Sequence, residues 1–409
     1  MSRLGRELER AAREREDPAA RERSLRVVRA AFEAERAAAT ARSRRPRRWR
    51  AFVVTALVAL VGAAGVAAAS APRSDVGRFV RGVFGVGEPH ARAALVHVPG
   101  GGRLLVAAGD SAWVVATDGA KRRLGAYAGA SWSPHGKFAV VWRGRELTAV
   151  EPSGAVRWSL PAPAAVGDAR WAPGDGFLVA YRSGDALRLV AGDGTGDRRL
   201  AASRGGVAAS WRPDATHTLA YADARGRVTV VDADTGVRRW RGAPLAGVRE
   251  LLWSASGQRL LAVTARRLVL YGAGGTLLRS RALPPGMRAE HAVWAPRGTR
   301  VALVRSGGRS SRSDVVVLDS ERGLSERPLF DRLGRFGAPA WSPDGRWLLV
   351  PWPAADQWLF LPVGTVEKGA AAAAGVAAGR RTAVANIARQ FAPGTERGVF
   401  PRSVQWCCP

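Results

Sequence analysis

Trp341-Ser342-Pro343-Asp344-Gly345, followed after Arg346 by the apolar run Trp347-Leu348-Leu349-Val350, is the stretch that decides the fold of this 409-residue chain. Proline presets φ at the first turn position, aspartate bonds its own backbone, and glycine accepts a positive φ, so the stretch predicts a tight turn between two strands. Because the strand after the turn is apolar without alternation, both of its faces must be covered by other parts of the protein.

Five looser copies of this turn occur upstream. Together the six copies begin at Trp132, Trp171, Trp211, Trp253, Trp294 and Trp341, with intervals of 39, 40, 42, 41 and 47 residues. Repeats of about 40–45 residues that carry short strands are typical of β-propellers. The sequence therefore predicts an all-β protein in which each repeat is one four-stranded blade.

A further repeat is predicted at the two ends of this region. Residues 98–101 align with the turns, but His97 stands where tryptophan is expected, whereas residues 400–406 resemble the strand before a turn and end in Trp406. A ring must leave no open edge, so a C-terminal strand that completes the first blade would close it. We predict seven blades, with six as the alternative.

At these residues the chain resembles the TolB-type, WD-like propeller repeats, over roughly residues 95 to 365. The hairpin from Val231 to Trp240 is also similar to the Asp-x-x-Thr-Gly-x-x-x-Trp hairpin of pyrroloquinoline-quinone-type propellers, and Glu151 to Trp158 is a weaker copy. Propellers of these kinds include binding proteins, hydrolases and quinoproteins, so the resemblance implies a fold rather than an activity.

An uncharged stretch from Phe52 to Ala71, between Arg50 and Arg73, has the length of a membrane-spanning helix. The 15 residues before it hold six arginines and no acid, and the 15 after it hold three arginines and one aspartate. The positive-inside rule then predicts a cytoplasmic N-terminus and an extracytoplasmic propeller. The predicted domains are a basic helical segment (1–50), a transmembrane helix (51–72), a juxtamembrane stalk (73–94) and the propeller (95–409). An uncleaved anchor is favoured over a signal peptide cut after Ala71.

The N-terminal segment predicts a short helix, because Asp17-Pro18 is a suitable start and Leu25, Val28 and Phe32 share one face. Two interpretations stay open, a helix lying on the anionic inner leaflet and a docking helix for a cytoplasmic partner.

The net charge of +29 is carried almost entirely by arginine, since Lys121, Lys137 and Lys368 are the only lysines. With so much Ala, Gly and Val, this bias is typical of a GC-rich bacterial genome. A basic surface favours anionic partners such as lipid head groups or cell-wall polymers. No recognition helix or aromatic RNA-binding motif is present, which argues against nucleic acid as a partner.

The sequence predicts no catalytic, cofactor-binding or metal-binding residues. It has no Gly-x-Ser-x-Gly elbow, and its five histidines show no metal-ligand spacing. Asp193 and Asp197 offer two carboxylates to calcium, but their stretch also fits a hairpin turn. Cys407-Cys408 predicts a structural role, as buried thiols or as a disulfide that stiffens the closing strand, over a redox role.

The insertion that lengthens the last interval, Arg305 to Ser313, predicts a basic loop with Arg305, Arg309 and Arg312 as candidate binding residues. We interpret the chain as a membrane-anchored extracytoplasmic propeller that acts as a non-catalytic binding, scaffolding or sensor module for a protein or an anionic cell-envelope partner. The alternative is a propeller enzyme, either a quinoprotein-like dehydrogenase or one acting on glycans. Several carboxylates converging in the central channel would favour the enzyme.

Overall fold

The computed structural model describes residue 95 and residues 97–174, 177–213, 217–307, 312–364, 381–391 and 398–408. The chain divides into two compact units, Met1–Val86 and Gly87–Pro409, and every described residue belongs to the second. The predicted cytoplasmic segment, transmembrane helix and stalk lie outside the described residues. Among the residues that are described, no helix is long and apolar enough to cross a membrane.

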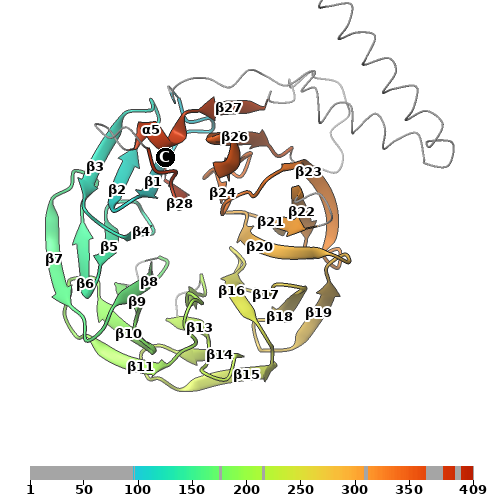
Figure 1. The fold of residues 1–409 in the computed structure, drawn as a ribbon. Helices are drawn as coiled ribbons and strands as arrows, with labels where there is room; N and C mark the ends of the chain where they lie inside the picture. Colours follow the sequence, from blue (N-terminus) through green and yellow to red (C-terminus); the bar gives the residue numbers. More distant parts are fainter. Residues whose placement is uncertain are drawn as a thin grey trace, which may run out of the picture. The chain divides into compact units, whose positions relative to one another are not determined.

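The described residues form seven four-stranded antiparallel sheets arranged in a ring, so the prediction of an all-β, seven-bladed propeller is confirmed (Figure 1). Within each blade we name the strands inner, second, third and outer. Blade 1 consists of β28 (Ser403–Cys407), β1 (Arg103–Ala108), β2 (Ser111–Val115) and β3 (Lys121–Gly125). Blade 2 consists of β4 (Gly129–Trp132), β5 (Ala139–Arg143), β6 (Glu146–Val150) and β7 (Val156–Pro161). Blade 3 consists of β8 (Val166–Trp171), β9 (Leu178–Ser183), β10 (Ala186–Ala191) and β11 (Arg198–Ala202).

The remaining blades follow the same order. Blades 4 to 7 consist of β12 (Ser210–Trp211), β13 (Thr218–Ala222), β14 (Arg227–Asp232) and β15 (Arg238–Pro244); β16 (Val248–Trp253), β17 (Arg259–Thr264), β18 (Arg267–Gly272) and β19 (Leu277–Ala282); β20 (Met287–Trp294), β21 (Arg300–Gly307), β22 (Arg312–Asp319) and β23 (Ser325–Leu333); and β24 (Ala340–Trp341), β25 (Trp347–Trp352), β26 (Gln357–Pro362) and β27 (Thr382–Ala385). Two short helices complete the described elements, the 3-10 helix η1 (Pro353–Ala355) and α5 (Ile387–Gln390).

The last strand of the chain closes the ring, as the sequence predicted. Strand β28 pairs with β1 along its whole length, so that the C-terminus supplies the inner strand of blade 1. Its Trp406 lies opposite Leu104 of the second strand. The repeat tryptophans of the other blades occupy the same position, as Trp132 does opposite Ala139 and Trp341 opposite Leu348. The indole of Trp406 packs edge-on against Phe360 of blade 7, with ring centroids 5.7 Å apart. Closure therefore joins the first and last strands of the propeller through a β-ladder, and blade 1 to blade 7 through a core contact.

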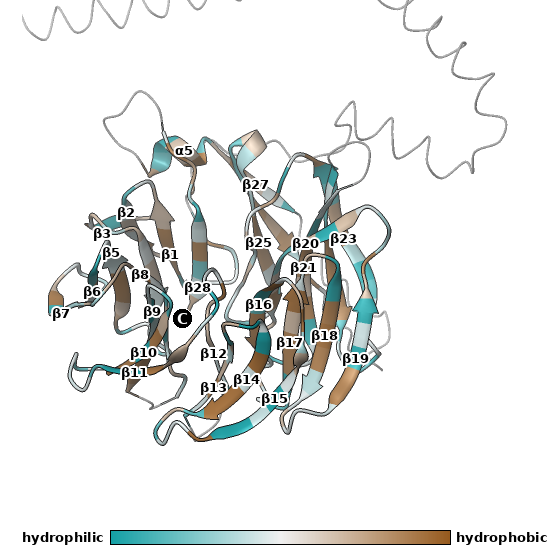
Figure 2. Cartoon of the chain, turned by 60° about the horizontal axis from the view of Figure 1, so that its bottom comes forward, coloured by the Kyte–Doolittle hydropathy of each residue, from teal (hydrophilic) through white to brown (hydrophobic). Residues whose placement is uncertain are grey.

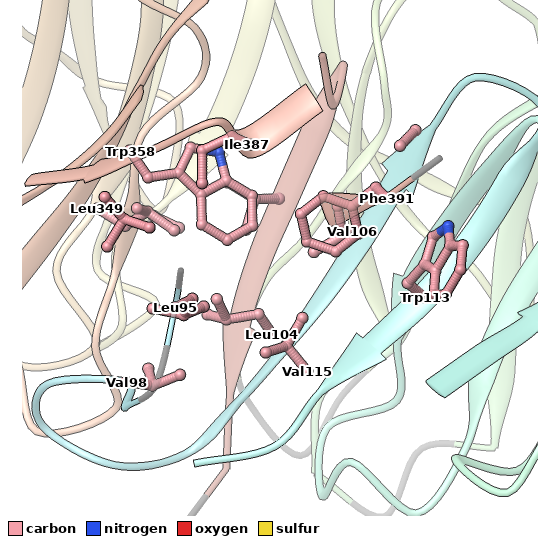
Figure 3. Close-up of a cluster of buried hydrophobic side chains, with 14 of the residues drawn as sticks. Leu95, Val98, Leu104, Val106, Trp113, Val115, Leu349, Trp358, Ile387 and Phe391 are labelled. Atoms are coloured by element: carbon pink, nitrogen blue, oxygen red, sulfur yellow. The ribbon is translucent and has the colours of Figure 1, made fainter. Parts of the chain in front are cut away.

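The hydrophobic core lies between neighbouring blades rather than in one central mass. The second and third strands are almost wholly buried, because each is covered on both faces by the adjacent blades. The cluster between blades 7 and 1 is an example: Figure 3 shows Trp358 of β26 and Phe391 facing one another, with ring centroids 5.3 Å apart. Leu95, the first described residue, packs into the same cluster.

The propeller has two distinct faces because successive strands of a blade run in opposite directions. One face carries the turns between inner and second strands together with the hairpins between third and outer strands, and we call it the turn face. The opposite face carries the turns between second and third strands and the segments that lead to the next blade. Helix α5 belongs to such a segment, so we call this side the α5 face (Figure 2).

The outer strand of blade 7 is short. Residues Thr382–Ala385 form β27, but Asn386 adopts a left-handed conformation with φ of 56°, and the chain then turns into α5. The carboxylate of Asp356 accepts a hydrogen bond from the backbone N–H of Ala388 at 2.8 Å, which satisfies a donor of the first helical turn. A side chain distant in sequence thus caps the helix that follows the strand.

Arginines join neighbouring blades in a way that recurs around the ring. The guanidinium of Arg300, in blade 6, lies 5.3 Å from the ring centre of Trp341 and donates a 3.1 Å hydrogen bond to the carbonyl of Gly345 in the turn of blade 7. Arg103 and Arg212 make the same pair of contacts, with Trp132 and Gly136 and with Trp253 and Gly257, respectively. Part of the arginine excess therefore has a structural role.

We expect Arg300→Ala to lower the stability by about 2 kcal/mol, because it removes both a cation–π contact and a hydrogen bond from a charged donor. In a propeller of this size that corresponds to a melting temperature lower by about 3 °C, measurable by calorimetry. Arg297→Ala is the matched control, since Arg297 is an exposed arginine of the preceding turn. Equal melting temperatures for the two variants would show that the contacts of Arg300 with Trp341 and Gly345 do not stabilise the protein.

Candidate functional site

The central channel is lined by residues of the inner strands. Since side chains alternate along a strand, the positions one and three residues before a repeat tryptophan share one face, and in most blades they line the channel together with residues between them. They surround a cavity of about 510 Å³. The lining residues three positions before the tryptophan are Asp168, Ala208, Glu250, Ala338 and Ser403, and those one position before it are Arg170, Ser210, Leu252, Val293 and Gln405.

The channel carries two carboxylates, and both have partners. Asp168 lies at a bulge of β8, where it adopts a φ of 54°, and its Oδ2 accepts a 3.1 Å bond from Nε of Arg182. Glu250 of β16 accepts the backbone N–H of Ala292 at 2.7 Å, and its other oxygen lies 3.1 Å from Nδ1 of His291. The two carboxylates stand on blades 3 and 5 and are each held by a neighbouring group.

Arg170 lies nearer to the turn face than either carboxylate. Inner strands run toward the turn that follows the tryptophan, so the layer one residue before it is the layer closest to that face. Burial lowers the pKa of the Arg170 guanidinium, an effect that the charges of Asp168 and Glu250 oppose. Within the described part of the chain its side chain donates one hydrogen bond, from Nη1 to the carbonyl of Ala169 at 2.9 Å. Arg170 is thus a cation inside the channel with unused donors.

Five apolar side chains are exposed along the turn face of blades 2 to 5, and we call them the turn-face arc. They lie at the start of an outer or second strand, directly after a turn or hairpin, and are Val156, Phe177, Val237, Leu277 and Leu278. The other large apolar residues exposed within the described ranges, Leu333 and Val399, lie on the α5 face. In Figure 2 one end of β19 is apolar while most of the strand is hydrophilic. Exposed apolar groups that gather on one face indicate an interaction surface.

Arginines accompany the turn-face arc. Arg238 follows Val237, and Arg279 follows Leu278. Their neighbours Arg239 and Arg281 pair with Asp232 and Glu326, whereas Arg238 and Arg279 are exposed and have no ion-pair partner among the residues described. The arc therefore combines apolar contact area with uncompensated positive charge.

Contacts between blades hold the arc in place. Trp240 of β15 packs against Gly275 of the next hairpin and donates a 2.8 Å hydrogen bond to the carbonyl of Ala273. Trp158 does the same at Gly194 and Gly192, where the bond is 2.7 Å. A Cβ on Gly275 would lie 2.8 Å from the indole, so this position has room only for glycine. The tryptophans of the two Trp-ended hairpins identified in the sequence thus lock neighbouring hairpins together.

The three arginines predicted as a binding loop do not come together in a loop. Arg305 lies within β21, its side chain is 6% exposed, and it pairs with Asp314 at 2.6 Å and Glu326 at 3.1 Å. Arg312 begins β22 and pairs with Asp331, and Arg309 lies outside the described residues. The predicted loop is shorter than expected because the hairpin ladder continues to the pair Gly307 and Arg312. Placing Arg305 in an exposed loop was wrong.

The carboxylates weighed as calcium ligands have separate roles in a hairpin. Asp193 accepts the backbone N–H and the hydroxyl of Thr195, whereas Asp197 pairs with Arg188 at 2.6 Å and accepts the Tyr181 hydroxyl at 2.7 Å. Burial, reinforced by Asp197, raises the pKa of Tyr181. In the described ranges no group of three or more His, Cys, Asp or Glu side chains is placed to hold a metal ion.

Cys407 and Cys408 form a disulfide at the end of β28. The Cys408 sulfur lies 3.6 Å from the carbonyl of Pro134, in the turn of blade 2. This position agrees with the disulfide form of the structural role predicted from the sequence.

The channel residues Asp168, Arg170 and Glu250 were missed in the sequence. A signal for them exists, because they stand one or three residues before Trp171 and Trp253. Counting back one and three residues from a repeat tryptophan identifies these positions once the inner strand is recognised.

Comparison with solved structures supports the fold. The chain is similar to a chain of the mitotic checkpoint complex (TM-score 0.53, 18% identity, 67% of this chain and 87% of that one) and to the Cps50 (Swd1) β-propeller domain of Myceliophteria thermophila (0.52, 16%, 65% and 94%). It is also similar to TolB from Acinetobacter baumannii (0.47, 16%, 75% and 67%). At these identities the likeness concerns the fold alone. No protein-family model and no curated protein matches the sequence.

Proposed function

We propose that this protein is a membrane-anchored, extracytoplasmic propeller that binds a protein partner through its turn face and does not act as an enzyme. The observation that carries the proposal is the turn-face arc, five exposed apolar side chains across four consecutive blades with the exposed Arg238 and Arg279 beside them. Aromatic residues and arginine are enriched in protein interfaces, and a partner with acidic groups would complement Arg238 and Arg279.

Two further features support the proposal. The turn-face hairpins are clamped by Trp158 and Trp240, so the surface is preorganised and loses little freedom on binding. The uncharged stretch 52–71 and its arginine asymmetry support a single-pass anchor with the propeller outside. The two channel carboxylates stand on different blades and are already paired, an arrangement that suits recognition better than acid–base chemistry.

Site-specific photo-crosslinking tests this proposal in cells that make the protein naturally. A photoreactive phenylalanine analogue at Val237 or Leu277 should yield a discrete crosslinked species, because the partner covers these positions. The same analogue at Leu333 or Val399 is the matched control, since both are exposed apolar sites on the opposite face. Equal crosslinking from both faces, or none from the turn face, would overturn the proposal.

A further inference from the structure

We infer that Arg170 is an anchoring site for a carboxylate group that enters the central channel from the turn face. Arg170 lies in the channel layer nearest that face, and the turn residues Pro173 and Pro213 line the same cavity. The carboxylates Asp168 and Glu250 stand one layer deeper. A ligand that enters from the turn face therefore meets the guanidinium before it meets either negative charge.

The guanidinium has the hydrogen-bonding capacity that such a ligand needs. It carries five N–H donors, of which one is used on the Ala169 carbonyl. The nearby carboxylates are committed elsewhere, Asp168 to Arg182 and Glu250 to Ala292 and His291. A planar carboxylate can accept two parallel bonds from arginine, and the weak hydration of a guanidinium makes its desolvation less costly than that of an ammonium group.

The other groups of the same layer fit a singly charged, planar anion. Ser210 accepts the backbone N–H of Trp253 at 3.1 Å, which leaves its hydroxyl proton available as a donor. Leu252 and Val293 make the adjoining wall apolar, which strengthens an ion pair formed beside them. A doubly charged phosphate is disfavoured, because Asp168 and Glu250 lie behind the site.

This inference rests on the proposed function only for the source of the carboxylate. If a protein docks on the turn-face arc, an acidic side chain at the centre of its interface would reach the channel mouth, where the half-buried Arg170 is of a residue type common among interface hot spots. The same chemistry fits a free carboxylic acid. The two sources are separate arms of the test.

The test measures binding to the purified full chain by titration calorimetry with four probes: butyrate, the blocked peptide acetyl-Gly-Glu-Gly-amide, its glutamine counterpart, and inorganic phosphate. We expect butyrate and the acidic peptide to bind and the glutamine peptide not to bind. Arg170→Gln should weaken binding at least tenfold, Arg170→Lys should weaken it less, and Arg297→Gln, an exposed arginine of another turn, should leave it unchanged. Tighter binding of the acidic peptide than of butyrate would assign the site to a protein side chain, and the reverse order to a free acid.

Absence of binding by both acidic probes, or equal binding by the wild type and Arg170→Gln, would overturn the inference. So would binding of inorganic phosphate in preference to either carboxylate. An unchanged melting temperature of Arg170→Gln shows that lost binding is not lost folding. Because this assay needs no partner, its failure is distinguishable from a failure of crosslinking at the turn-face arc.

Discussion

A chain that ends at residue 398 should fail to form a stable propeller. Removing residues 399–409 takes away β28, which leaves the edge of β1 unpaired and the channel side of blade 1 without its inner strand. It also removes Trp406 from its contact with Phe360 and the Gln405 side chain that accepts the backbone N–H of Trp132 at 3.0 Å. Loss of the partly buried Trp406 alone should cost about 3 kcal/mol, against a typical domain stability of roughly 5–15 kcal/mol. We expect aggregation, or a melting temperature far below that of the intact protein, by calorimetry and size-exclusion chromatography.

Two shorter changes separate closure of the ring from a general effect of truncation. Trp406→Ala keeps the β28 ladder and should destabilise by about 3 kcal/mol, at the lower end of the range because Trp406 is only partly buried. Removal of Cys408 and Pro409, which lie beyond the ladder, should have a much smaller effect. If the chain ending at 398 melted like the intact protein, β28 would not be the element that closes the ring.

Asp314→Ala is expected to be the most damaging single substitution among the charged residues of the β21–β22 hairpin. Arg305 is buried, and its guanidinium forms a two-bond pair with Asp314, at 2.9 and 2.6 Å, and a further bond to Glu326. Removing one partner of a buried pair leaves an uncompensated charge, at a cost of roughly 3–5 kcal/mol. Because Glu326 remains, we expect a loss of about 3 kcal/mol, measured as a lower urea midpoint.

Asp331→Ala, on the neighbouring strand β23, is the matched control. Asp331 pairs with Arg312, but both side chains are more than 40% exposed, and an exposed pair contributes no more than about 1 kcal/mol. Similar urea midpoints for the two variants would show that the Arg305 pair is no stronger than a surface pair. Arg305→Met should be milder than Asp314→Ala, since it removes the buried charge itself and leaves two partly exposed carboxylates.

The sequence by itself determined the architecture, because the signals for it are local and repeated. The residues Pro343, Asp344 and Gly345 favour a tight turn through their own backbone preferences. The apolar runs that follow the repeat turns require burial on both faces. The first repeat has His97 where a tryptophan is expected, and the C-terminal strand ends in Trp406 without a turn after it. The two could be assigned to one blade because a ring must not leave an open edge. The seven blades and their closing strand follow from these features.

Only the tertiary structure decided which polar groups meet. Arg305 looks like a loop arginine in sequence, but the ladder extends past it and two carboxylates from other strands surround it, so it is buried. Arg300 looks like one of many dispersed charges, yet the neighbouring blade brings Trp341 and the Gly345 carbonyl to it. Likewise, Asp168, Arg170 and Glu250 face one channel only because blades 3 and 5 curve around it. Such partners lie about 40 residues or more apart along the chain, or are fixed by strand register, and neither turn chemistry nor hydrophobic period specifies how side chains of different blades are aligned.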